Sequence, residues 1–364
     1  MNKFRKLHAY SGLVRQQTGK SRLRQALEIL ALHRGRLQLG IEEYYELGVF
    51  DDRAFPGPEK ARCLGWKSSA LIDQALNDDY WRATANDKVL NYALLAHYGF
   101  PIPQTMAIWS LSGQRIGDET VLCDEAALRA YLDASLPFPV FIKPIHGTYG
   151  RGTFCLQQKL PNDTGWLDCR GKAVGRDELL AACLNPKFGG MLFQQRLAQH
   201  PAVVTLVGDT VSCVRIIVAL GAGSHPEVVL AFWKIGRERN ITDNFCMGES
   251  GNLLAWIDVG SGRVERVITG LWPDGKECEQ HPDTGGRLPG AALPDWPAAL
   301  SLCCEAARHF PGLRLQHWDV AFAIDGPVLM ELNTEADLGV PQFLGRKAFV
   351  TERIDAQLAK LARR

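Results

Sequence analysis

The sequence has almost no net charge, no paired cysteine motif and no long apolar run. It contains 41 Lys and Arg against 40 Asp and Glu, a formal charge of +1, so no overall field attracts nucleic acid or an anionic membrane. None of its ten cysteines forms a Cys-x-x-Cys pair, which argues against a zinc ribbon or a dense disulfide framework. Neither a membrane span nor the apolar core of a signal peptide is visible. We therefore expect a cytoplasmic protein with no nucleic-acid partner.

The 364 residues are 46% hydrophobic, enough for a large core divided into two or three units. The basic residues are unevenly spread. Residues 1–40 hold one acid, Glu28, and nine basic side chains: Lys3, Arg5, Lys6, Arg15, Lys20, Arg22, Arg24, Arg34 and Arg36. This segment either contacts an anionic surface or forms a solvated helical face, and we favour the solvated face.

Apolar spacing predicts α+β architecture with a helical N-terminal region. Helical spacing occurs at 23–31, 66–80, 86–99, 125–134, 177–184 and 296–310. Strand-like runs occur at 105–109, 140–143, 191–194, 211–220, 228–235, 253–259 and 314–324. Residues 272–297 have the composition of a long surface loop. We expect boundaries at 1–85 for the helical region, 86–195 for a first α+β unit and 196–364 for a second.

One phosphate-binding motif is incomplete. Thr18-Gly19-Lys20-Ser21 has the ending of a Walker A loop, but Val14 stands where that loop needs a glycine. The preceding residues, Arg15-Gln16-Gln17, are polar and do not form a buried strand. We therefore discard a P-loop.

The C-terminal part predicts a β-hairpin that carries three polar side chains. Two apolar runs, 317–324 and 328–333, flank Asp325-Gly326-Pro327, a turn sequence in which proline need not donate to the ladder. A three-residue loop would set Asp319 opposite Asn333 and Ala321 opposite Glu331. Asp319, Glu331 and Asn333 would then share one face.

Two carboxylates and an amide on apolar strands would repel each other and lose hydration unless a cation lay between them. Such oxygen ligands suit Mg²⁺ or Mn²⁺, which keep water or phosphate as further ligands. The alternative is that Asp319 and Asn333 bind backbone groups at the strand ends while Glu331 faces solvent. The residues alone leave both interpretations open.

A second pattern points to phosphate. Lys143 ends an apolar run, and the following loop contains Gly147, Gly150 and Gly152. A fixed positive charge beside free backbone N–H groups can hold phosphate. The same glycines could equally form an ordinary turn. Their meaning comes from occurring together with the acidic hairpin.

Taken in order, these motifs resemble the ATP-grasp superfamily. The resemblance rests on Asn86-Asp87-Lys88, Lys143 with its Gly-rich loop, Gln194 to Leu197, Arg215, and Asp319 followed by Glu331-Leu332-Asn333. More narrowly, residues 40–47, His200-Pro201, 211–216, 242–245 and Trp318-Asp319 are similar to the sugar-transfer-associated ATP-grasp family, which is related to α-L-glutamate ligases. The resemblance implies two α+β subdomains that clasp ATP.

The resemblance also implies roles for individual residues. ATP would be bound by Lys88, Lys143, Gly147, Gly150, Gly152, Gln195 and Leu197. The reacting groups would be faced by Arg215, Lys234, Arg239 and Asn244. Magnesium or manganese would be bound by Asp319, Glu331 and Asn333. The chain departs from many relatives at Gln195, where they carry glutamate, and at Glu249, where a second glycine is common.

The implied activity is an ATP-dependent ligase that joins a small-molecule carboxylate to an amine through an acyl phosphate, in polysaccharide or sugar-linked biosynthesis. A small-molecule kinase is the alternative, because an alcohol could attack the same phosphate with His146 or Asp243 as base. A non-catalytic nucleotide-binding module is a third hypothesis. Nothing in the sequence indicates the oligomeric state or names the substrates.

Overall fold

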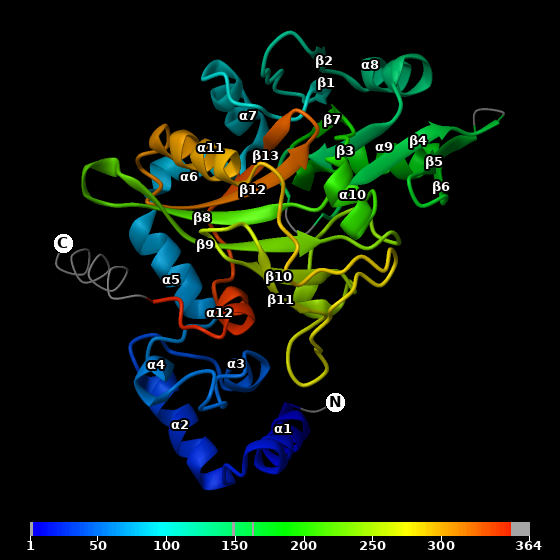
Figure 1. Ribbon diagram of the computed structural model, residues 1–364. Coiled ribbons are helices and arrows are strands. Elements are labelled where there is room, and N and C mark those ends of the chain that lie inside the picture. Colours follow the sequence, from blue (N-terminus) through cyan, green and yellow to red (C-terminus); the bar gives the residue numbers. More distant parts are fainter. Residues whose placement is uncertain (1–2, 148–149, 162–163, 351–364) are drawn as a thin grey trace.

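The computed structural model describes residues 3–147, 150–161 and 164–350 (Figure 1). Two β-sheets with flanking helices form the body of the molecule, and a group of helices extends from it at the N-terminal end, so the predicted α+β class is confirmed. Residues 148 and 149 of the predicted phosphate loop, and residues 351–364 of the last predicted unit, lie outside the described residues. Within the described part, every helix is too short or too polar to cross a bilayer.

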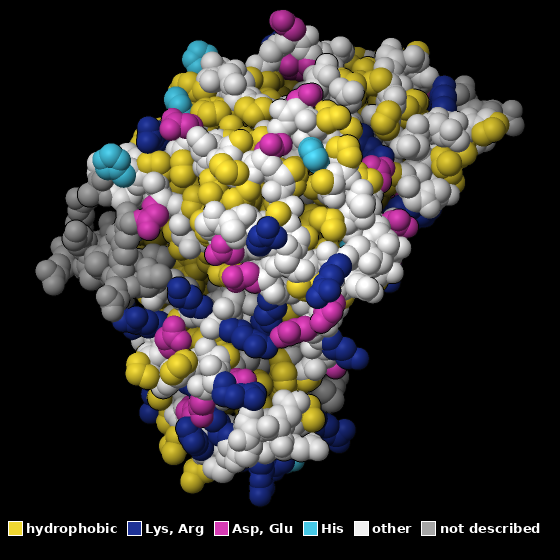
Figure 2. All heavy atoms as spheres, in the orientation of Figure 1, with side chains coloured by type: hydrophobic (Ala, Val, Ile, Leu, Met, Phe, Trp, Pro, Cys, Tyr) yellow, Lys and Arg dark blue, Asp and Glu magenta, His cyan; other side chains and the backbone are white. Residues whose placement is uncertain are grey.

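The first helices are α1 (Lys3–Thr18), α2 (Arg22–Arg34), α3 (Ile41–Glu46) and α4 (Gly57–Lys60). Figure 2 shows Lys and Arg side chains gathered on this region with acidic groups among them. Several basic residues have acidic partners from 42–52; Lys6, for example, binds Glu42 and Glu46. Lys20 is 5% exposed and binds Glu28 and Asp52. The lysine of the incomplete phosphate motif is therefore an internal ion-pair residue.

Three further helices lead to the sheets: α5 (Trp66–Leu76), α6 (Asp79–Asn86) and α7 (Lys88–His97). The single helix predicted over 66–80 is wrong, because the chain leaves helical geometry at Asn77 and Asp78 caps α6 instead. The predicted start of α7 is confirmed: Asp87 accepts a hydrogen bond from the N–H of Leu90 at 3.0 Å. That cap fixes Lys88 at the first position of the helix.

A seven-stranded sheet follows, in the order β2-β1-β7-β3-β4-β5-β6. Its strands are β1 (Thr105–Trp109), β2 (Thr120–Leu122), β3 (Val140–Pro144), β4 (Phe154–Lys159), β5 (Gly165–Asp168), β6 (Ala173–Gly175) and β7 (Met191–Gln195). Helices α8 (Glu125–Ala130) and α9 (Arg176–Cys183) contribute apolar residues to the core of this sheet. Strands β5 and β6 are short, and apolar spacing does not predict them.

The second sheet has the order β11-β10-β9-β8-β12-β13. Its strands are β8 (Val214–Leu220), β9 (Pro226–Ile235), β10 (Leu253–Ile257), β11 (Val264–Ile268), β12 (Leu315–Ala323) and β13 (Gly326–Asn333). The accompanying helices are α10 (Pro201–Val207), α11 (Trp296–Arg308) and α12 (Gly339–Gly345).

Side chains alternate between the two faces of this sheet along its central strands, β8 and β12. Ile216 and Trp318 belong to the core under α11. Figure 1 shows that helix lying against the second sheet. Ile217 and Leu315 belong to a second core shared with the N-terminal helices. Successive strand residues point to opposite faces, so Arg215 and Asp319 point away from α11. The face opposite α11 therefore carries the charged residues.

The β12–β13 hairpin forms, but with a different register from the prediction. Only Ile324 and Asp325 make the loop, because Ala323 pairs with Gly326, and Phe322 with Pro327. The proline is therefore in the strand and not in the turn, which is tolerated because β13 is an edge strand. The pairs Asp319–Asn333 and Ala321–Glu331 expected from a three-residue loop are wrong.

A β-bulge sets the final pairing of the acidic residues. With a two-residue loop, a regular ladder would place Met330 opposite Asp319 and turn Glu331 to the other face. The ladder shifts by one residue between Val320–Leu329 and Asp319–Glu331, so Met330 is the extra residue. Asp319 consequently lies directly opposite Glu331, and the predicted common face is preserved.

Candidate active site

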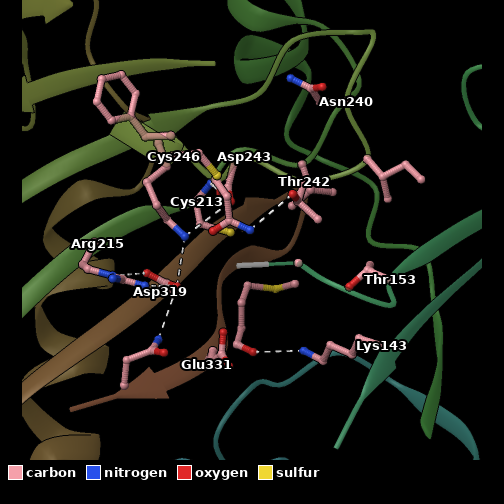
Figure 3. A pocket seen from close by; sticks show the side chains of 18 of the residues that line it. Lys143, Thr153, Cys213, Arg215, Asn240, Thr242, Asp243, Cys246, Asp319 and Glu331 are labelled. Atoms are coloured by element: carbon pink, nitrogen blue, oxygen red, sulfur yellow. Dashed lines mark hydrogen bonds and ion pairs between the residues drawn. The ribbon is translucent and has the colours of Figure 1, made fainter. Parts of the chain in front are cut away.

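A cavity of about 720 Å³ lies between the two sheets, within the usual size of a small-molecule site. Its walls come from the Gly-rich loop after β3, the end of β7, and the charged face of the second sheet, and it reaches α3 and Trp66 of the N-terminal region. Figure 3 shows Arg215 and Asp319 facing each other across adjacent strands, Glu331 beside Asp319 on the same sheet, and Lys143 on the other side of the cavity. Both sheets and the N-terminal helices therefore build one cavity.

Asp319 is the most heavily paired carboxylate of the cavity. Its Oδ1 and Oδ2 accept hydrogen bonds from Nε and Nη2 of Arg215, each at 2.7 Å. The Nζ of Lys234 on β9 also donates to Oδ2, at 3.0 Å. Burial alone would raise the pKa of Asp319, but the two cations outweigh it and hold the pKa below its ordinary value. Asp319 is thus an anion at neutral pH.

Asp243 forms the other half of this network. One of its oxygens accepts the N–H of Cys213 at 2.7 Å and the other binds Nζ of Lys234 at 3.3 Å. Burial lowers the pKa of Lys234, but Asp243 and Asp319 outweigh this effect and raise the pKa above its ordinary value. Lys234 therefore stays charged although it is only 8% exposed.

Glu331, the cross-strand partner of Asp319 on β13, faces two lysines from α7 and β3. The Nζ of Lys88 lies 3.0 Å from Oε1 of Glu331 and donates to the carbonyl of Gly147 at 3.1 Å. The Nζ of Lys143 donates to the hydroxyl of Tyr92 at 2.7 Å. Burial favours protonation of Glu331, but Lys88 and Lys143 outweigh it and lower its pKa. Burial lowers the pKa of Lys143, while the charge of Glu331 opposes the shift.

The Gly-rich loop packs against the second sheet's side of the cavity. Gly150 has a φ of +69°, and a Cβ there would lie 2.9 Å from Oγ1 of Thr242 and 3.0 Å from Nδ2 of Asn244. A side chain at this position would therefore be strained and crowded. Glycine allows the Gly-rich loop to approach the 242–244 segment closely.

The far end of the cavity is lined by the segment that follows β7. Gln195 is the exposed last residue of that strand, and Arg196 and Leu197 continue along the wall. Phe141 on β3 adds an apolar surface beside them. This apolar and amide-bearing end contrasts with the charged end around Asp319.

Most residues predicted for the site line this one cavity. They are Lys88, Lys143, Gly147, Gly150, Gln195, Leu197, Arg215, Lys234, Asn244, Asp319, Glu331 and Asn333. Gly152 lies next to it, where a Cβ would meet the ring of Phe188. Arg239 is not brought to the cavity: it is exposed, and its Nη2 donates to the carbonyl of Ser250 at 3.1 Å.

Other residues that build the site were not assigned a role from the sequence. Tyr92 lies behind the cavity wall, where it is buried and accepts a hydrogen bond from Lys143, but on the sequence it is one apolar position of α7. Glu42, Glu46 and Trp66 reach the cavity from the N-terminal region, and no spacing rule links them to a hairpin some 270 residues later. Only the fold brings these segments together.

The donor set fits a magnesium ion that arrives with a nucleotide. Asp319 and Glu331 are both ionised and stand opposite each other, and Nδ2 of Asn333 lies 3.4 Å from Oδ2 of Asp319. Mg²⁺ commonly binds one or two carboxylates and takes its other ligands from water and phosphate. The described residues contain no group of three or more His, Cys, Asp and Glu side chains that could hold a metal. An ion here would therefore need ligands from outside the chain.

Two sheets that enclose lysines from α7 and β3, with an acidic hairpin on the second sheet, define an ATP-grasp fold. The sequence model described as sugar-transfer associated ATP-grasp matches residues 68–356. The chain belongs to this family, and the resemblance seen in its motifs is confirmed. A comparison with curated proteins found no match.

Several solved structures are similar to this chain. The ATP-grasp ligase PsnB, complexed with a minimal precursor, is 18% identical with a TM-score of 0.37, over 83% of this chain and 71% of that one. The VanG D-Ala:D-Ser ligase from Enterococcus faecalis is 15% identical with a TM-score of 0.39, over 79% and 63%. Biotin carboxylase from Campylobacter jejuni, as its complex with an ATP analogue, is 10% identical with a TM-score of 0.44, over 81% and 51%.

Proposed function

We propose that this protein is an ATP-dependent carboxylate-amine ligase that works through an acyl phosphate. The observation that carries the proposal is that four of the cations lining the cavity lie around the acidic pair Asp319 and Glu331, namely Lys88, Lys143, Arg215 and Lys234. Family membership supports ATP as the phosphate donor. A role in polysaccharide or sugar-linked biosynthesis follows from the family description and remains part of the proposal.

Phosphoryl transfer depends mainly on positioning and on neutralising charge. Lys88 and Lys143 would bind the α- and β-phosphates, beneath the Gly-rich loop. Arg215 and Lys234 would face the γ-phosphate, because both are held in place by Asp319. Their low exposure strengthens each charge–charge contact relative to water.

Asp319, Glu331 and Asn333 would hold the divalent ion. When bound, Mg²⁺ neutralises phosphate charge and orients the oxygens of the triphosphate. The chain's own contribution is to keep both carboxylates ionised through Arg215, Lys234 and Lys88.

The proposed nucleophile is the substrate's carboxylate, which is already ionised near pH 7 and needs no base. Its oxygen attacks the γ-phosphorus, ADP leaves, and an amine then displaces phosphate from the acyl carbon. The site favours this sequence over alcohol phosphorylation, because both oxygens of Asp243 are engaged by Cys213 and Lys234. His146 is half exposed and binds Asp87. Both residues predicted as bases for a kinase, Asp243 and His146, therefore already have polar partners.

The test is ADP release in the presence of Mg²⁺ with panels of carboxylates and amines. We expect release that requires one member of each panel, and a new amide in the product by mass spectrometry. Glu331→Gln should reduce turnover at least a hundredfold, whereas Glu305→Gln on the exposed side of α11 should not change it. Release that requires an alcohol and no amine would overturn the proposal in favour of a kinase. Nucleotide binding without any release across the panels would favour a non-catalytic module.

A further inference from the structure

Two cysteines face each other on the wall of the cavity. Cys155 lies on β4, and Cys169 directly follows β5, the neighbouring antiparallel strand. Leu156 pairs with Asp168, and the N–H of Cys169 donates to the carbonyl of Cys155 at 2.8 Å. The two cysteines are therefore directly opposed across the strands. Both line the cavity.

This placement is compatible with a covalent bond between the two sulfurs. Directly opposed residues of an antiparallel pair have Cα atoms about 4.5 to 5.5 Å apart, inside the range of about 4.4 to 6.8 Å found for disulfides. Both are free cysteines, and the backbone hydrogen bond between them already holds the two residues side by side.

The two thiols differ in exposure and in ionisation. Cys155 is 3% exposed, whereas Cys169 is half-buried and reachable from the cavity. The neighbouring thiol of Cys155 and the charge of Arg196, opposed by burial, lower the pKa of Cys169 to about 7. The neighbouring Cys169 and burial raise the pKa of Cys155. One thiol is thus suited to attack and the other to resolve.

We propose that Cys155 and Cys169 form an oxidisable dithiol, a modification site on the cavity wall that reacts with small-molecule disulfides. The thiolate of Cys169 attacks one sulfur of the disulfide RSSR and releases RS⁻, leaving a mixed disulfide on Cys169. Cys155 loses its proton, attacks the Cys169 sulfur and releases a second RS⁻. The two cysteines lose two electrons and RSSR gains them, so the step balances.

The pair also stands beside the segment proposed to hold the nucleotide. Arg196, whose charge acts on both thiols, follows Gln195 and lines the same wall. If the proposed function holds, bound nucleotide covers this wall and slows the reaction of Cys169. Disulfide formation in the nucleotide-free protein does not depend on that function, so the two proposals fail separately.

The experiment uses the full-length, reduced protein and oxidised glutathione at pH 7, with disulfides mapped by non-reducing peptide mass spectrometry. We expect a Cys155–Cys169 cross-link as the main product. Cys155→Ser should trap glutathione on Cys169, and Cys169→Ser should leave Cys155 unmodified. Cys123→Ser, which removes an exposed cysteine elsewhere, should give the same cross-link as the wild type.

A second measurement uses the wild type alone and does not depend on whether the variants fold. Iodoacetamide labelling of the nucleotide-free protein should give a rate for Cys169 that reaches half of its high-pH limit near pH 7. A Cys169 rate at pH 7 no faster than that of Cys123 would overturn the proposal. A mixed disulfide that persists on wild-type Cys169 without a cross-link would also overturn it.

Discussion

Lys143 is a buried side chain whose charge suits the binding of an anion but loses hydration in the folded protein. It is 8% exposed, and its ammonium has one hydroxyl partner, Tyr92, in close contact and no carboxylate bound directly. Burial lowers its pKa because the charged form loses hydration. A buried ammonium that loses hydration in this way contributes little to folding, and a negative ligand in the cavity would complete its surroundings.

Replacing Lys143 with methionine tests this separation of roles. Lys143→Met keeps most of the side-chain volume, so the free energy of unfolding in urea should change by less than about 1 kcal/mol. Affinity for an ATP analogue should fall at least tenfold, as measured by isothermal titration calorimetry. The exposed Lys187→Met is the control and should alter neither quantity. A large loss of stability with unchanged affinity would assign Lys143 to the fold.

The hairpin β12–β13 shows what a sequence can and cannot specify at the scale of an element. Its two strands follow from apolar alternation, and the polar residues Asp319, Glu331 and Asn333 follow from their interruption of that pattern. The loop length and the bulge at Met330 do not follow, because a bulge depends on the partner strand and on contacts such as the one from Tyr92 to the Met330 carbonyl. The prediction that Asp319 and Glu331 share a face is correct, although the strand register from which it was derived is wrong.

The long segment predicted as a loop over 272–297 forms only isolated bridges up to residue 295, after which α11 begins, and an ion pair holds it against the second sheet. Asp283 binds Arg237, which follows β9, through Nε at 2.7 Å. The hydrogen bonds from Arg237 lower the pKa of Asp283 to about 2. A lowered carboxyl pKa stabilises the fold above the unfolded pKa of about 4, and that contribution is lost as the pH falls toward 2.

Asp283→Asn should therefore lower the free energy of unfolding at pH 7, by no more than about 1 kcal/mol because solvent screens this exposed ion pair. The difference from the wild type should stay constant from pH 7 to about pH 5 and shrink below pH 4, because the wild-type carboxylate then becomes protonated. Urea titrations between pH 7 and pH 3 measure it, with the exposed Asp118→Asn as the control. A difference that grows on acidification would contradict the assignment.

At the scale of the whole molecule, an aromatic cluster joins the N-terminal helices to the second sheet's loop. The ring of Trp272 lies 5.0 Å from those of Tyr10 and Phe50 and stacks on Tyr45 at 6.2 Å. Its Nε1 also donates to Gln17 at 3.1 Å. Since α3 lines the cavity, this cluster positions one wall of the site from outside.

Trp272→Ala should loosen the N-terminal helices without unfolding the sheets. Hydrogen exchange should accelerate at least tenfold in α1 and α3, while β8 and β12 keep their protection, because they belong to the core shared with α11. Tyr80→Ala, at a 94% exposed ring, is the control and should leave exchange unchanged. Equal acceleration in the central strands would contradict this description.

The packing of the N-terminal region could not be predicted from the sequence. Residues 1–40 were predicted as a solvated helical face, but Lys20 departs from this because it is buried in an internal ion pair with Glu28 and Asp52. The acidic partners of this region, Glu46 and Asp52, could not be assigned because ion pairs between distant helices leave no spacing signal. Most strands of the two sheets could be predicted because strand periodicity is a local pattern. The cavity that the sheets share with α3 could not, because it depends on long-range packing.

The most direct test of a magnesium-nucleotide site is the affinity for a non-hydrolysable ATP analogue, measured by calorimetry with Mg²⁺ and with excess chelator. For the wild type we predict at least tenfold tighter binding with Mg²⁺, and for Glu331→Gln we predict that this difference disappears. Equal affinities with and without Mg²⁺ in the wild type, or a magnesium effect that survives in Glu331→Gln, would contradict it.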